Sequence, residues 1–173
     1  MQPDHPSSSS SPSQPAAAPA KAAGAAKSVC ADSTIEVAKG QQVAVRMYGR
    51  KKSGQTSPVV VHFHGGAFVS GDLDNGCTVA SLLEGAGAVV VSVAYPLTPF
   101  PQPVDTGYDV LKWVHRNRNK LGGQGALVYL AGEEAGGNLA AAVSLVARDQ
   151  SHPPLAGQIL LSPMLDPCVG TAS

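Results

Sequence analysis

The sequence lacks an excess of charge, a cysteine framework and any apolar run long enough to cross a membrane. Twelve basic side chains balance twelve acidic ones among 173 residues. No basic patch marks a nucleic-acid surface, so we expect no nucleic-acid partner. Cys30, Cys77 and Cys168 are an odd, widely spaced set without a C-x-x-C pair. This argues against a disulfide framework or a zinc site and fits a reducing compartment. We also expect no membrane span.

The N-terminal segment has neither the charged start nor the apolar core of a secretory signal, so we predict a cytoplasmic location. Residues 1–32 are rich in Ser, Pro, Ala and Gly and show no apolar periodicity. Such a segment cannot bury enough surface to offset its ordering entropy, and we expect a disordered tail. Residues 33–173 are long enough to form one domain with a hydrophobic core.

The composition changes after residue 32, and apolar runs begin to alternate with helical patterns. Two alternating segments joined by a Lys39-Gly40 turn predict an antiparallel hairpin over 34–37 and 42–48. Runs typical of strands buried on both faces follow at 59–64, 89–94, 127–131 and 159–161. Helical patterns lie between them at 78–85, 104–120 and 138–149. We predict an α/β domain with a mostly parallel sheet and helices on both faces.

Two glycine-rich motifs follow two of these apolar runs. In the first, His64-Gly65-Gly66-Ala67-Phe68, adjacent glycines allow the backbone to approach a ligand and to direct its N–H groups outward. This geometry can hold a developing oxyanion. The second, from Gly132 to Gly136, has the spacing of a nucleophile elbow, G-x-S-x-G, between a strand and a helix. Glu134 stands where that motif has its serine.

These motifs, together with Tyr95-Pro96-Leu97-Thr98-Pro99-Phe100-Pro101 and the run from Gly132 to Leu139, resemble a known family. The chain is similar to the hormone-sensitive-lipase branch of the α/β-hydrolases, the fold-3 carboxylesterases, from about Val59 to Asp166. That family carries an H-G-G-G loop, a Y-R-L-A-P…F-P stretch and a G-D-S-A-G-G-N-L elbow. The resemblance implies an α/β-hydrolase-like sheet, truncated here after about the sixth strand. It also implies a small acyl ester as the substrate, with no cofactor and no metal.

The resemblance further implies an oxyanion hole built from backbone amides. The implied donors are the amides of Gly65, Gly66, Ala67 and Ala135. Ala67 replaces the family's third glycine but keeps its N–H group. The elbow requires a close approach of strand and helix, which the resemblance assigns to Gly132, Gly136 and Gly137. His62 and His64 alternate on one strand, but no further ligand completes a metal site, so structural roles are favoured.

Glu134 has no hydroxyl, and three interpretations of it are open. Glu133 and Glu134 could simply cap the following helix, whose N-terminus favours negative charge. The carboxylate of Glu134 could instead turn back and occupy the oxyanion hole. It could also serve as a nucleophile, as an aspartate does in epoxide hydrolases and haloalkane dehalogenases.

The remainder of a catalytic triad is also missing, because the acid and the histidine of α/β-hydrolases follow later strands. After the elbow the only histidine is His152, which comes too early, and neither Asp149 nor Asp166 matches the triad acid. We therefore predict a carboxylic-ester hydrolase by lineage that is inactive as a serine esterase on its own. Two alternatives remain: a small-molecule-binding module, like the plant gibberellin receptors that resemble this family, and an incomplete domain with an exposed apolar sheet edge. The sequence specifies no oligomeric state.

Overall fold

A computed structural model of the chain describes residues 30–166. Most of the predicted disordered tail, and Cys168, lie outside the described residues. The first strand begins at Cys30, so the predicted tail boundary at residue 32 is wrong by three residues. Nearly all side chains of this strand are exposed. Residues 30–33 are all exposed and show no apolar periodicity, so only pairing with the next strand reveals this part, whereas the alternation over 34–37 predicts the rest of β1.

A six-stranded sheet forms the centre of the fold, with the strand order β1-β2-β4-β3-β5-β6. The strands are β1 (Cys30–Glu36), β2 (Gln42–Tyr48), β3 (Val59–Phe63), β4 (Val89–Val93), β5 (Val128–Glu133) and β6 (Gly157–Leu161). A short 3-10 turn, η1 (Ala38–Gly40), joins β1 to β2. The hairpin β1–β2 is antiparallel and joins β4 in antiparallel fashion, whereas β4, β3, β5 and β6 run parallel. The predicted hairpin and the parallel order of the later strands are confirmed.

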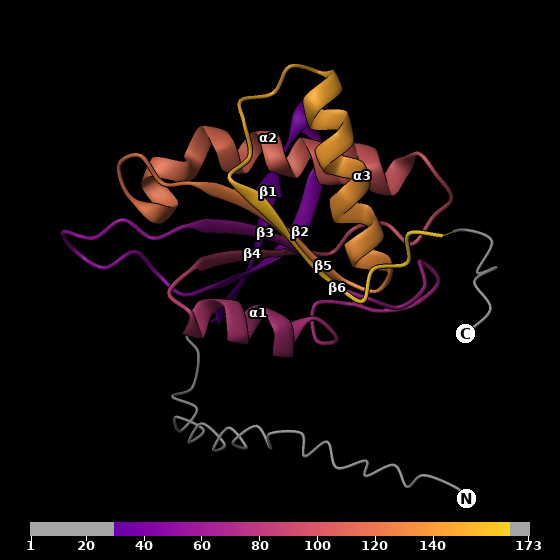
Figure 1. The fold of residues 1–173 in the computed structure, drawn as a ribbon, viewed down its shortest axis with the longest axis horizontal. Coiled ribbons are helices and arrows are strands. Elements are labelled where there is room, and N and C mark those ends of the chain that lie inside the picture. Colours follow the sequence, from indigo (N-terminus) through magenta and orange to yellow (C-terminus); the bar gives the residue numbers. More distant parts are fainter. Residues whose placement is uncertain (1–29, 167–173) are drawn as a thin grey trace, which may run out of the picture.

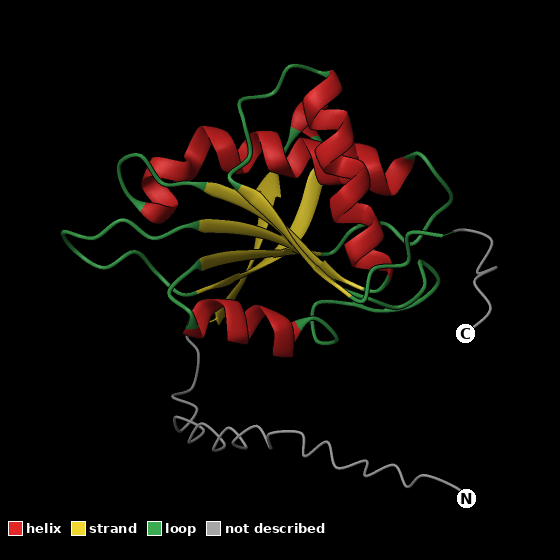
Figure 2. Ribbon diagram, in the orientation of Figure 1, coloured by secondary structure: helices red, strands yellow, loops and turns green. Residues whose placement is uncertain are grey.

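Helices cover both faces of the sheet, as predicted. One face carries α1 (Cys77–Gly85), and the other carries α2 (Gln102–Gly122) and α3 (Ala135–Asp149) (Figures 1 and 2). Because side chains alternate along a strand, Val61 and Phe63 pack toward α2 and α3, whereas Val60 packs toward α1. Burial of both faces explains why β3 and β4 are apolar throughout except for one polar residue in each strand.

The carboxyl ends of the parallel strands bring the two glycine-rich motifs together. Phe63, the last residue of β3, is in register with Gly132 of β5. The loop after β3 and the turn after β5 therefore leave the sheet side by side, at the edge where open α/β sheets bind ligands.

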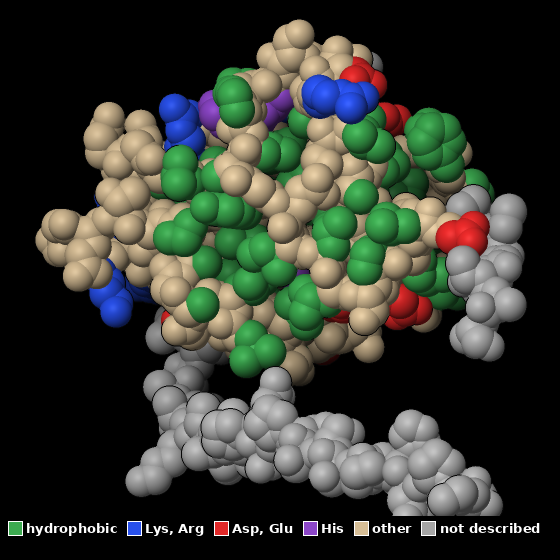
Figure 3. Space-filling view, in the orientation of Figure 1, with side chains coloured by type: hydrophobic (Ala, Val, Ile, Leu, Met, Phe, Trp, Pro, Cys, Tyr) green, Lys and Arg blue, Asp and Glu red, His purple; other side chains and the backbone are tan. Residues whose placement is uncertain are grey.

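The strand β6 forms one margin of the sheet and pairs only with β5 among the described residues. Figure 3 shows hydrophobic side chains spread over the face on which α3 and β6 lie. The large apolar side chains that are exposed in α3, in β6 and in the segment after β6 are Leu145, Ile159, Leu161, Met164 and Leu165. This margin of the described sheet is apolar. No described helix combines the length and the hydrophobicity needed to cross a membrane.

Candidate functional site

Glu134 is the single residue between the end of β5 and the start of α3. Its backbone has φ 54° and ψ −115°, a combination that is rare outside glycine and that costs conformational energy. Hydrogen bonds to the segment around the end of β6 hold it there. The Glu134 N–H donates to the carbonyl of Leu161, and the Glu134 carbonyl accepts the N–H of Met164, each over 3.0 Å. The backbone of a nucleophile elbow is thus present without its serine.

Glycines at the elbow allow α3 to approach the sheet closely. A Cβ atom on Gly136 would collide with the carbonyl oxygens of Phe63 and His64, and one on Gly132 would collide with the backbone of Gly136. A Cβ atom on Gly137 would lie 2.9 Å from the Cβ of Pro163. The first residue of α3, Ala135, is fully buried.

The loop after β3, which we call the glycine loop (His64 to Phe68), turns back on itself. Gly66, Ala67 and Phe68 have positive φ values of 118°, 52° and 62°. The Gly66 carbonyl accepts the N–H groups of Val69 and Ser70, each over 3.0 Å. Ala67 lies exposed on the outside of the turn, and Gly65 and Gly66 direct their N–H groups toward the end of β5.

Two consecutive carboxylates bind these two consecutive N–H groups. The Gly65 N–H donates to Oε1 of Glu133 over 3.3 Å, and the Gly66 N–H donates to Oε2 of Glu134 over 3.2 Å. Although Glu134 occupies the N-cap position of α3, its side chain makes no capping hydrogen bond. Glu133 belongs to β5. The interpretation that these glutamates cap the helix is therefore wrong, because both side chains turn toward the glycine loop.

A buried hydrogen-bonded chain holds Glu133, and the sequence did not reveal it. His62 is fully buried; its Nε2 lies 2.7 Å from Oε2 of Glu133, and its Nδ1 lies 3.0 Å from Oγ of Ser92. Because a carboxylate only accepts, Nε2 carries the proton and the Ser92 hydroxyl donates to Nδ1. The only sequence signal was one polar residue within each of two apolar strands. Ser92 is fully buried, so it is inaccessible to a substrate.

His64 packs within the glycine loop. Its Nδ1 donates to the carbonyl of Gly65 over 2.7 Å, and its ring stacks on that of Tyr95 with centroids 4.4 Å apart. The Tyr95 hydroxyl donates to the His64 carbonyl over 2.7 Å. Burial, together with the negative charges of Glu133 and Glu134, raises the pKa of Tyr95 to about 12. Within residues 30–166, no group of three or more His, Cys, Asp or Glu side chains could hold a metal ion.

His152 lies at the far end of α3 from Glu134. Its ring packs edge-on against His115, with centroids 4.9 Å apart, and against Tyr108 at 6.0 Å. The helix between has 15 residues and is therefore about 22 Å long. His152 cannot take a proton from residue 134 across this distance.

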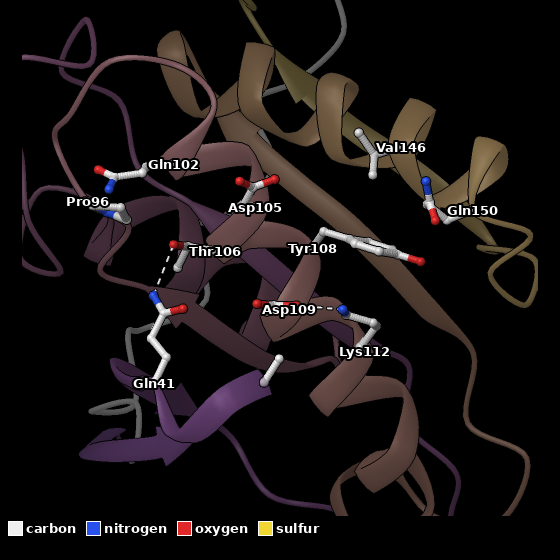
Figure 4. A pocket seen from close by; sticks show the side chains of 11 residues that line it. Gln41, Pro96, Gln102, Asp105, Thr106, Tyr108, Asp109, Lys112, Val146 and Gln150 are labelled. Carbon is white, nitrogen blue, oxygen red and sulfur yellow. Dashed lines mark hydrogen bonds and ion pairs between the residues drawn. The ribbon is translucent and has the colours of Figure 1, made fainter.

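An open pocket of about 780 Å³ lies beside α2 and α3, away from the elbow (Figure 4). In it Lys112 pairs with Asp109 and lies 4.6 Å from the ring centroid of Tyr108. Gln41 donates from Nε2 to Oγ1 of Thr106 over 3.3 Å. No residue of the glycine loop or the elbow lines this pocket. It is therefore separate from the predicted site.

The chain is similar to esterases and to a hormone receptor of the α/β-hydrolase fold. A family model described as "alpha/beta hydrolase fold" matches residues 60–173. Carboxylesterase NlhH of Mycobacterium tuberculosis is 40% identical over 125 residues, which cover 70% of this chain and 39% of that protein. A gibberellin receptor of Arabidopsis thaliana is 38% identical over 120 residues, covering 64% of this chain and 34% of the receptor.

Solved structures give the same result. An esterase from Pyrobaculum calidifontis superimposes with a TM-score of 0.70 at 40% identity, over 78% of this chain and 45% of that one. Esterase LipW from Mycobacterium marinum superimposes with a TM-score of 0.72 at 36% identity, over 80% and 45%. The chain spans less than half the length of these relatives.

Replacing Gly136 by Ala tests the close contact at the elbow. Because the added methyl group meets two backbone carbonyls that cannot move independently, we expect the free energy of unfolding to fall by about 3 kcal/mol or more. Gly85→Ala is the matched control: its Cβ would meet nothing within 4 Å, so we expect a change within about 0.5 kcal/mol or a small gain. Urea unfolding followed by circular dichroism measures both. Equal effects of the two substitutions would contradict the contact.

The raised pKa of Tyr95 predicts a loss of stability in alkali. The unfolded chain releases the phenolic proton near pH 10, whereas the native state holds it to about pH 12. The stability that this group contributes is therefore present below pH 10 and is lost as the pH rises toward 12. Burial also raises the pKa of Tyr48. Tyr95→Phe should thus reduce the alkaline loss without abolishing it.

Urea unfolding at several pH values between 8 and about 11 measures this effect. Tyr129→Phe, which removes one phenol and leaves Tyr95 in place, is the control. An unchanged alkaline profile in Tyr95→Phe would show that burial of this phenol does not couple to folding.

Proposed function

The chain belongs to the α/β-hydrolase fold family, in its carboxylesterase branch, and from this premise we propose that it is an ester hydrolase by lineage that does not turn over esters by the serine mechanism. One observation carries the proposal: the carboxylate of Glu134 stands at the elbow and accepts the N–H of Gly66.

A serine esterase needs a hydroxyl at the elbow, a base that takes its proton, and free donors for the oxyanion. Glu134 supplies no hydroxyl. Its Oε2 also engages Gly66 over 3.2 Å, the amide that the family resemblance assigns to oxyanion binding. Two of the three requirements, the hydroxyl and the free oxyanion donor, are therefore unmet because of residue 134 itself.

The third requirement, a base, is also unmet among the described histidines. His62 is committed to Glu133 and Ser92, and His64 donates to Gly65. His115 and His152 pack against each other at the far end of α3. No described histidine lies free beside the elbow.

The geometry also argues against Glu134 as a carboxylate nucleophile. In that mechanism the Gly66 N–H would hold the carbonyl oxygen of the substrate while Glu134 attacks the adjacent carbon. The same N–H is already bonded to the Glu134 carboxylate. One amide proton cannot fully serve both acceptors.

A second candidate function, a small-molecule-binding module, is favoured by the 38% identity to a gibberellin receptor. That candidate requires the wild-type chain to bind a small acyl or carboxylate ligand saturably and without turnover. It differs from the first candidate in needing a site that is open in the wild type.

Hydrolysis of p-nitrophenyl acetate and butyrate tests the proposal. We expect the wild type, Glu134→Ala and Glu134→Ser all to match the heat-denatured control, because the serine variant still lacks a base. The same proteins treated with a fluorophosphonate should show no mass increase. Thermal unfolding of each variant verifies that it is folded.

Two outcomes would contradict the proposal. Wild-type hydrolysis that is lost in Glu134→Ala would identify Glu134 as a nucleophile. Robust hydrolysis by Glu134→Ser would reveal a base among residues that the geometry excludes.

A further inference from the structure

We infer that the glycine loop forms a carboxylate-binding site beside the elbow, and that the side chain of Glu134 is its tethered ligand. The inference rests on the proposed function in one respect, that residue 134 is not catalytic. It names the ligand class of the site: short unbranched monocarboxylates such as acetate and propionate.

The position of the Glu134 carboxylate is the first argument. Glu134 is exposed, so its side chain could extend into water, where a carboxylate is best hydrated. It instead folds back over Gly65, where an added Cβ would lie 2.8 Å from Oε2 and 3.3 Å from the Cβ of Glu134. The missing side chain at Gly65 is the space that this carboxylate fills.

The local charge is the second argument. Glu133 and Glu134 place two carboxylates beside each other, which is unfavourable without compensation. No lysine or arginine pairs with either of them in the described part of the chain. Glu133 has His62 and the Gly65 N–H as partners. The Glu134 carboxylate has the Gly66 N–H as its partner.

The third argument is that the donor is oriented independently of Glu134. The Gly65 carbonyl, which belongs to the same peptide group as the Gly66 N–H, accepts a hydrogen bond from Nδ1 of His64 over 2.7 Å. The neighbouring Gly65 N–H is fixed by Glu133, which His62 holds in turn. Truncation of Glu134 therefore leaves the Gly66 N–H in place and without its acceptor. Because Gly65 and Gly66 are only half-buried, a free ion can reach it.

The chemistry of truncation defines the matching ligands. Glu134→Ala removes the CγH2–carboxylate group, which is the size of acetate. Glu134→Gly also removes the Cβ, and the lost group is the size of propionate. Each variant thus creates a vacancy that one monocarboxylate fills best, whereas Glu134→Gln keeps the volume of the side chain and leaves no vacancy.

Thermal unfolding of the purified chain with increasing sodium acetate or propionate tests this inference. Sodium chloride at equal ionic strength and acetamide, a neutral analogue of similar size, serve as controls. For dissociation constants of about 10 mM, we expect about 100 mM acetate to raise the Tm of Glu134→Ala by about 3–5 °C, with saturation. Propionate should be the better ligand of Glu134→Gly. The wild type and Glu134→Gln should respond to acetate only as they respond to chloride.

The inference is overturned if Glu134→Ala and Glu134→Gly respond to carboxylates no more than Glu134→Gln does, or if all four proteins gain equally, as a general salt effect would produce. Glu134→Ala could lack a cooperative unfolding transition in chloride. In that case, restoration of the transition by acetate supports the site, and failure of acetate to restore it overturns the inference. A wild type that binds acetate as tightly as Glu134→Ala also overturns the inference and supports the receptor candidate. Ester turnover by the wild type would refute the proposed function alone, so the two failures are distinguishable.

Discussion

The structure around the elbow depends on two consecutive backbone N–H groups that bind two consecutive carboxylates, Gly65 to Glu133 and Gly66 to Glu134. The two pairs differ in burial. The Glu133 side chain is tied through His62 to the interior of the sheet, whereas Glu134 is exposed and its carboxylate bonds to the glycine loop. One carboxylate therefore positions the glycine loop, and the other occupies the donor that this positioning presents.

The backbone geometry of a nucleophile elbow is present although residue 134 is a glutamate. The strained backbone of residue 134 is held by Leu161 and Met164, and the elbow glycines keep α3 against β3. Neither device depends on which side chain residue 134 carries. A serine can therefore be replaced by a glutamate without loss of the turn, and the longer side chain can then reach the Gly66 N–H. Because the backbone of the turn is held independently of the side chain, side chains of different chemistry can occupy position 134 on the same fold.

Much of the fold was predictable because apolar runs such as 59–64 and 89–94 are buried on both faces and keep their hydrophobicity along their whole length. The elbow was also predictable, because Gly132 and Gly136 are spaced as the close contact between β5, α3 and the end of β3 requires, and a side chain at either position would collide with backbone. The start of β1 at Cys30 was not, because exposed strand residues carry no periodicity. The chain of Ser92, His62 and Glu133 was missed because its members come from three strands that only the sheet brings together. The capping interpretation failed because the side chain of Glu134, although it stands at the N-cap position of α3, bonds instead to the Gly66 N–H of the glycine loop.

The most direct measurement of the central interaction is the amide proton shift of Gly66 in 1H–15N NMR spectra, recorded for the wild type and Glu134→Gln while the pH is lowered from neutral. A hydrogen bond to a carboxylate moves an amide proton downfield, because the charged acceptor makes the stronger bond. We predict a downfield Gly66 proton that moves upfield as acid neutralises Glu134. In Glu134→Gln the downfield position of the Gly66 proton and its movement with pH should both be absent. The Gly65 proton, bound by Glu133, should have the same chemical shift as in the wild type. A Gly66 proton that is the same in both proteins at every pH would contradict the account.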